Sequence, residues 1–175
     1  TGAPQNTFRT PLEKLKIEEA IQLINKNGMK IENIIVHAPY LINLANCEDD
    51  EKYNLSIRLL KTEVERTLKI GCKYLVLHPG CSLKADKLEA IKRVASALNQ
   101  IFELYPTITI LIETMAGKGS EIGSSFIEVK QIIDLIDKKE CIGVCLDTCH
   151  IHDAGYNLCQ IDELIQEFDS IIGLH

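Results

Sequence analysis

Short apolar runs rich in β-branched residues alternate with helical patterns along this chain, and this alternation limits its possible folds. The runs are NIIVH (residues 33–37), YLVLH (74–78), ITILIE (108–113), IGVCLD (142–147) and IIGLH (171–175). Runs of this length with little polar alternation are typical of strands buried on both faces. Helices between such strands predict parallel pairing through right-handed crossovers.

Apolar residues recur with helical spacing between these runs. The spacing predicts helices over residues 12–27, 53–70, 83–104, 126–136 and 161–168. No linker or low-complexity tract interrupts the pattern, so we expect residues 1–175 to belong to a single domain. Two α/β architectures are compatible with it: an open, doubly wound sheet and a (β/α)₈ TIM barrel.

Each predicted strand ends in a residue that can bind a metal ion. These residues are His37, His78, Glu113, Asp147 and His175. In a barrel the C-terminal ends of the strands converge on one mouth, whereas an open sheet spreads them along an edge. A single convergent site therefore favours the barrel, and the chain contains about five of the strand–helix units that a complete barrel requires.

The stretch DTCHIHD after the fourth run adds a sixth candidate ligand. We expect it to be a loop at the barrel mouth, with Asp147 and His150 facing the same cavity. A catalytic zinc takes three protein ligands, so six ligands indicate at least two ions, and Glu113 is placed to bridge them. The imidazole-rich set suits Zn²⁺, with Mn²⁺ or iron as alternatives, because Mg²⁺ and Ca²⁺ prefer oxygen ligands.

Paired divalent ions are typical of enzymes that hydrolyse phosphodiesters, in which they lie about 3.5–4 Å apart. Glu113, as the expected bridge, is the candidate catalytic group. The competing interpretation is that unrelated polar residues line the rim. For His152 we expect a role in the loop or behind the ligands, and Asp153 is a candidate to orient a ligand imidazole.

Composition excludes several classes of protein. The net charge of −6 argues mildly against nucleic-acid binding, although each bound divalent ion would add two positive charges. The seven cysteines form no CxxC pair, which argues against a disulfide framework and a structural zinc knuckle. No apolar run approaches the roughly 18 residues of a membrane helix, and no signal peptide is visible, so we expect a cytoplasmic protein.

Several stretches resemble one known family. In chain order they are TGAPQNT, VHAPYLINLAN, LVLHPG, ILIETMAGKG, VCLDTCHIHDAGYN and a final GLH. This set resembles endonuclease IV, the zinc-dependent apurinic/apyrimidinic endonucleases built on the (β/α)₈ barrel. The resemblance covers essentially the whole chain, and HAPYLINL together with DTCH and the following AGY is specific in combination.

The resemblance implies an activity and a partner. It implies hydrolysis of duplex DNA on the 5′ side of an abasic site, leaving a 3′-hydroxyl, by a monomer with three zinc ions. It also implies that Tyr40 enters the DNA at the damaged site. A second DNA-contacting loop would include Gln5 and Asn6.

The resemblance further distributes the ligands among the ions. His37 and His78 would hold one ion, and Glu113 would bridge it to a second. Asp147 and His175 would bind the second ion, and His150 the third. The family pattern continues past GLH with further ligands, so we expect this chain to be a piece of a longer protein and inactive by itself.

Two other functions remain open from the sequence. Metal-dependent sugar isomerases or epimerases also place His, Glu and Asp at the strand ends of a similar barrel, usually with fewer ions. The chain could also bind metal or a partner without turnover.

Overall fold

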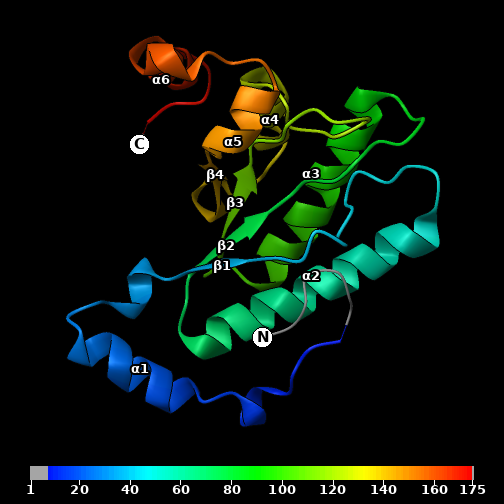
Figure 1. Ribbon diagram of the computed structural model, residues 1–175. Helices are drawn as coiled ribbons and strands as arrows, with labels where there is room; N and C mark the ends of the chain where they lie inside the picture. Colours follow the sequence, from blue (N-terminus) through cyan, green and yellow to red (C-terminus); the bar gives the residue numbers. More distant parts are fainter. Residues whose placement is uncertain (1–7, 175) are drawn as a thin grey trace.

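A four-stranded parallel sheet forms the centre of the computed structural model, which describes residues 8–174 (Figure 1). The strands are β1 (Ile35–His37), β2 (Tyr74–Leu77), β3 (Thr109–Glu113) and β4 (Ile142–Cys145). They lie side by side in sequence order, β1-β2-β3-β4. A doubly wound sheet reverses its strand order at a switch point, whereas a barrel adds each strand beside the previous one, so the order fits the predicted barrel.

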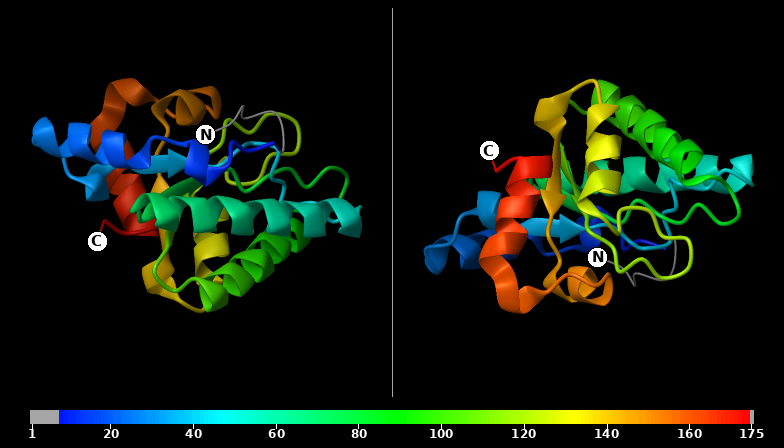
Figure 2. Two further views of the ribbon diagram at one scale, coloured as in Figure 1. Left: turned by 90° about the horizontal axis from the view of Figure 1, so that it is seen from below. Right: turned by 90° about the horizontal axis from the view of Figure 1, so that it is seen from above.

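A helix follows each strand, and the helices between the strands cover one face of the sheet. The longer helices are α1 (Ile17–Lys26), α2 (Asp50–Ile70), α3 (Lys87–Leu104), α4 (Phe126–Asp134) and α6 (Ile161–Ile171), with a short α5 (Thr148–Asp153) after β4. Figure 1 shows α2 and α3 on the same side of the sheet. In Figure 1, α6 lies at the top of the view, well away from α2, and the right view of Figure 2 shows α6 and α3 on opposite sides of the molecule. Among residues 8–174, none of these helices combines the length and apolarity that crossing a membrane requires.

The two faces of the sheet differ in chemistry. Leu75, Leu77, Ile110 and Ile112 are fully buried and belong to the main hydrophobic cluster, together with residues of α2, α3 and α4. The alternate positions on β2 and β3, which include Glu113, point to the opposite face. Burial of one apolar face against helices thus leaves the other face to carry polar groups at the strand ends.

Side-chain caps fix where the helices begin. Asp49 accepts a hydrogen bond from the Lys52 amide, and Asp86 accepts from the Leu88 amide, which starts α2 and α3. Helix α2 ends at Gly71, whose φ of 90° is left-handed and favours glycine. Because Asp86 caps α3, the helix that we expected from residue 83 begins at Lys87 instead.

The prediction of a fifth strand over residues 171–175 is wrong for the described residues. Ile171 is the last residue of α6, and no strand follows it up to residue 174. Ile171 and Ile172 join Phe168 in a second hydrophobic cluster, so these apolar residues pack as the end of α6 and not as a strand. Within residues 8–174 the sheet has four strands, not five.

Two other expected elements differ from the structure. Residues 12–27 are not one helix, because a short 3₁₀ helix, Leu12–Lys14, is followed by an extended Leu15 before α1 begins. The DTCHIHD stretch is not a loop, since Asp147 caps the short helix α5 by accepting from the His150 amide. The cap turns the chain at the end of β4 and brings His150 back over the sheet.

The core predicts a simple stability test on helix α3. Leu98 is fully buried, whereas Leu104 on the same helix is 55% exposed. Leu98→Ala should lower the free energy of unfolding by about 2–5 kcal/mol, because the substitution leaves a cavity. The control Leu104→Ala should change it by less than about 0.5 kcal/mol. Urea denaturation measures both, and equal losses would contradict this description of the core.

Candidate metal centre

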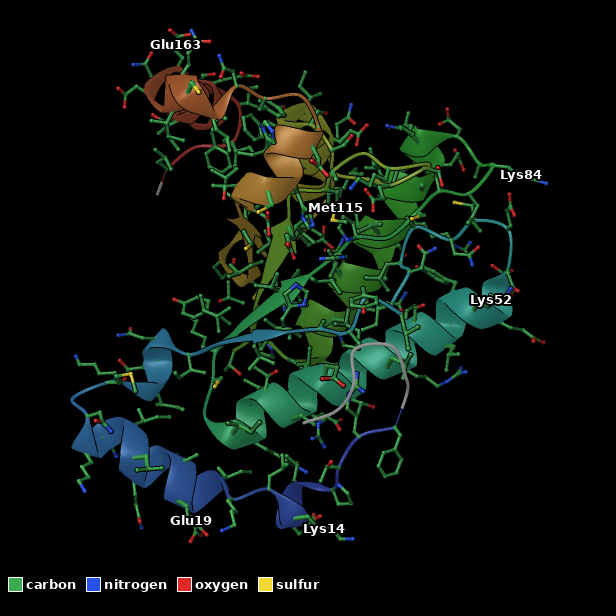
Figure 3. The ribbon with its side chains drawn as sticks, viewed as in Figure 1. Lys14, Glu19, Lys52, Lys84, Met115 and Glu163 are labelled. Atoms are coloured by element: carbon green, nitrogen blue, oxygen red, sulfur yellow. The ribbon has the colours of Figure 1, made fainter. Side chains whose placement is uncertain are left out.

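Four candidate ligands gather at the C-terminal ends of the strands. His37 ends β1, His78 follows β2, Glu113 ends β3, and Asp147 lies two residues beyond β4. In Figure 3, the labelled Met115 marks the point where the chain leaves β3, while Lys84 and Lys52 mark the β2–α3 loop and the start of α2. Because the strands pair in parallel and in sequence order, these four side chains lie close together although they are far apart in the sequence.

Glu113 is the centre of this group. Its side chain is 5% exposed, and its Oε2 lies 2.8 Å from His37 Nε2 and 2.9 Å from His78 Nε2. Its other oxygen, Oε1, lies 3.2 Å from His150 Nδ1. Each carboxylate oxygen thus faces at least one imidazole, so a single buried carboxylate lies between His37 and His78 on one side and His150 on the other.

The electrostatics follow from this contact. Burial alone would raise the pKa of Glu113, but hydrogen bonds from His37 and His78 and the charge on the two rings lower that pKa well below its ordinary value. The hydrogen bond to Glu113 raises the pKa of His37, against the opposing effect of burial. The buried carboxylate is therefore held ionised, which is the state that binds a cation.

The second nitrogen of His37 also has a partner. Its Nδ1 lies 2.6 Å from the carbonyl oxygen of Ala38 and can donate a proton to it. A backbone carbonyl in this position is the usual outer partner of a metal-binding histidine, because it fixes the tautomer and the ring orientation. His37 Nε2 is thereby left facing Glu113 and His78.

Asp147 and His150 form the other side of the centre. Asp147 Oδ1 accepts from the His150 amide at 2.9 Å and so caps α5, while Oδ2 lies 4.0 Å from His150 Nδ1. Ligand atoms of Glu113, Asp147 and His150 all lie within 4.8 Å of one another, as do those of His37, His78 and Glu113. Glu113 belongs to both groups.

Thr114 is a residue that the sequence did not point out. It is 1% exposed. Its Oγ1 accepts from the Asp147 amide at 3.0 Å, and its carbonyl oxygen lies 2.9 Å from His150 Nδ1. Thr114 thus connects the end of β3 to both ligands beyond β4, and only its position next to Glu113 could have suggested this role.

Tyr40 lies at the edge of the centre. Its side chain is 49% exposed, and its ring stacks on that of His78 with centroids 6.5 Å apart and an interplanar angle of 23°. An aromatic ring that is half exposed beside a candidate ligand is available to contact a bound molecule, and DNA contact by Tyr40 stays a prediction.

Some candidates lie outside this constellation. His175, Gln5 and Asn6 fall outside the described residues, so their roles stay predictions. Asp153 pairs with Lys118 at 2.7 Å. That contact joins α5 to the loop after β3, so Asp153 is engaged there in this structure. Whether His150 serves a second or a third ion also stays a prediction.

The donor set suits divalent metal ions of the zinc type. Three imidazoles and two carboxylates converge, and the central carboxylate is buried and ionised. Zinc, manganese and iron accept such mixed nitrogen and oxygen ligands, whereas calcium and magnesium prefer oxygen alone. Glu113 is the common partner of the three imidazoles, so the residues present fit such an ion.

The whole chain, residues 1–175, matches the family model described as "Xylose isomerase-like TIM barrel". The chain belongs to that family, and this confirms the predicted barrel, of which the described strands are one part. The fold and the residues at the strand ends thus define a TIM barrel that carries groups of side chains able to hold metal ions.

Within that family, the similarity to endonuclease IV is confirmed. A "Probable endonuclease 4" from Geobacillus sp. (strain WCH70) is 47% identical over 175 residues, which cover 99% of this chain and 58% of that protein. The crystal structure of endonuclease IV from Thermus thermophilus has a TM-score of 0.79 and 26% identity, with 99% of this chain and 60% of that one covered.

The fold is also shared with a different kind of enzyme. The crystal structure of a D-tagatose 3-epimerase-like protein has a TM-score of 0.72 and 23% identity, and the match covers 90% of this chain and 58% of that one. That likeness concerns the fold alone.

The chain spans about 58% of the length of its Geobacillus relative.

Glu113→Gln tests the shared carboxylate. We expect the variant to retain fewer metal ions than the unmodified protein, because both ligand groups lose a charged oxygen at once. Elemental analysis after dialysis against a weak chelator measures the metal content. Glu103→Gln is the control, because Glu103 lies near the end of α3 and pairs with Lys138 at 3.2 Å, ahead of β4 and apart from both ligand groups. Unchanged metal content in Glu113→Gln would contradict the assignment.

Proposed function

We propose that the protein containing this chain is a DNA-repair endonuclease that hydrolyses the phosphodiester on the 5′ side of an abasic site, leaving a 3′-hydroxyl. Its substrate would be duplex DNA carrying such a site, and its cofactor a cluster of zinc ions. The similarity to proteins named endonuclease 4 supports the class of reaction. The resemblance in HAPYLINL and DTCH supports the finer assignment.

The observation that carries the proposal is the sharing of Glu113 by two groups of ligands. Hydrolysis of a phosphodiester benefits from two neighbouring ions, because charge develops on both the attacking and the leaving oxygen. His37, His78 and Glu113 would hold one ion, and Glu113 with Asp147 a second. His150 and His175 would complete the set.

Each residue has a separate task in this proposal. The ions, when bound, would supply Lewis acidity that activates water and offsets charge on the phosphate. Glu113 keeps its negative charge in a buried position, as its lowered pKa requires. The carbonyl oxygens of Ala38 and Thr114 fix the orientation of His37 and His150. None of these tasks requires a nucleophilic side chain.

Selection of damaged DNA would take place at the rim. An abasic nucleotide has no base to unstack, so its displacement from the duplex costs less than that of an intact nucleotide. The Tyr40 ring, which is half exposed beside His78, would fill the gap left in the duplex. The loop with Gln5 and Asn6 would add further contacts.

A sugar epimerase or isomerase is the second candidate, because the D-tagatose 3-epimerase-like protein shares the fold. The two functions differ in the number of metal ions. A shared carboxylate with a ligand group on each side favours more than one ion. One ion per protein molecule after complete metal loading would favour the epimerase.

Incision of a defined substrate tests the proposal. The whole zinc-loaded protein is incubated with a duplex that has one abasic site, with and without a chelator, and the products are separated on a sequencing gel. We expect a cut on the 5′ side with a 3′-hydroxyl end that disappears on chelation. No incision by the zinc-loaded protein would overturn the proposal, and an intact duplex without the lesion is the control.

Tyr40→Ala tests the role of the rim. The variant should bind abasic DNA about tenfold more weakly, since stacking on a base or into a gap contributes about 1–3 kcal/mol. Its zinc content should stay unchanged, because Tyr40 stacks on His78 and is not one of the side chains proposed to hold an ion. Tyr40→Phe keeps the ring and should bind nearly as well. Equal affinities of all three proteins, measured by fluorescence anisotropy, would contradict this role.

A further inference from the structure

The loops after β1, β2 and β3 are bonded to one another at the rim of the metal centre. The Ile122 amide donates to the Gly80 carbonyl, and the Ser82 amide donates to the Ser120 carbonyl, each at 2.9 Å. These bonds join the loop after β2 to the loop after β3 through backbone groups. The loop after β1, which carries Tyr40, is joined by side chains instead: Glu48 Oε1 accepts from the Lys84 amide at 2.9 Å, and a second side chain bonds to Cys81.

That side chain is the carboxamide of Asn43. Its Nδ2 donates to the Cys81 carbonyl at 3.1 Å, and its Oδ1 accepts from the Cys81 amide at 3.0 Å. The same oxygen accepts from the Ala45 amide at 3.0 Å. The carboxamide therefore pairs with both backbone groups of Cys81, as a neighbouring strand would, and it holds its own loop in a turn.

Asn43 is also anchored from behind. Its backbone amide donates to Ser56 Oγ at 3.1 Å, and that hydroxyl donates to the Lys52 carbonyl at 2.9 Å. Ser56 is buried in α2. The loop after β1 is thus fixed both to the long helix α2 and to the loop after β2, with Asn43 at the junction.

On the other side of this contact, no residue larger than glycine fits at position 80. Gly80 has a φ of +109°, which favours glycine, and a β-carbon there would lie 2.1 Å from Asn43 Oδ1. Gly80 lies two residues after His78. The close approach of Asn43 to this glycine therefore sets where the chain leaves the candidate ligand.

We propose that Asn43 is a positioning residue for the metal centre, because its carboxamide ties the Tyr40 loop to the His78 loop. This inference rests on the proposed metal-dependent function of the same site. Tyr40, Asn43 and His78 line one pocket beside the centre. By holding the two loops together, Asn43 keeps the His78 ring in line with Glu113 and the Tyr40 ring against His78.

Asn99 provides a matched control. Its Nδ2 donates to the Leu135 carbonyl at 3.0 Å, and its Oδ1 accepts from the Asp137 amide at 3.0 Å. This is the same kind of bracket, from α3 to the segment that precedes β4, at the other end of the sheet from the ligands. Loss of either bracket should lower Tm, but only the Asn43 bracket lies next to the metal centre.

The experiment compares Asn43→Ala, Asn43→Asp and Asn99→Ala in the whole protein. Zinc affinity is measured by competition with a chromophoric chelator, DNA affinity by anisotropy with abasic duplex, and Tm by circular dichroism. Asn43→Ala should bind zinc about tenfold more weakly, the usual cost of losing a group that orients ligands. Asn43→Asp keeps both acceptor bonds and should fall between Asn43→Ala and the unmodified protein. Asn99→Ala should match the unmodified protein in zinc and DNA affinity.

The outcomes separate this inference from the proposed function. If Asn43→Ala binds zinc as tightly as Asn99→Ala does, the positioning role is wrong, even if the unmodified protein cleaves DNA. If Asn43→Ala does not fold, Asn43→Asp decides, and unchanged zinc affinity in that variant overturns the role. A protein whose zinc affinity depends on Asn43 but which cleaves no DNA keeps this inference and loses the proposed function.

Discussion

The contact between the buried carboxylate of Glu113 and three imidazole rings is the interaction on which the rest of the site depends. A buried carboxylate, in a side chain that is only 5% exposed, is costly to ionise unless positive charge or proton donors surround it. His37 and His78 supply donors to one oxygen, and His150 faces the other. A metal ion satisfies the same requirement more completely, and for this reason the arrangement supports a metal centre.

The register of the parallel strands is enough to bring these groups together. Parallel strands in sequence order place successive strand ends side by side, and the apolar face packed on α2, α3 and α4 fixes which side chains point the other way. The segments that connect the strands can therefore differ from one another in structure. Asp147 starts a short helix that returns His150 to the centre, while Asn43 and Thr114 fasten neighbouring loops.

The sequence predicted the four strands and the residues that lie together at their carboxyl ends, because both follow from local patterns. Apolar runs mark buried strands, and a His, Glu or Asp directly after such a run must lie at the carboxyl edge. The sequence could not predict the end of α6. The apolar pattern around Ile171 is compatible with both a strand and a helix, and only its packing in one cluster with Phe168 distinguishes them. The sequence did not predict the contacts of Asn43 and Thr114. Their side chains bond to backbone groups that are distant in the sequence, and such bonds produce no recognisable pattern of residues.

The location of the bound ions tests the shared carboxylate most directly. Crystals of the zinc-loaded protein, measured at the zinc absorption edge, would give one anomalous peak for each ion. The account predicts at least two peaks, each about 2.0–2.2 Å from a different oxygen of Glu113, one beside His37 and His78 and the other beside Asp147. A single peak, or Glu113 still bonded to the histidines with no ion between them, would contradict it.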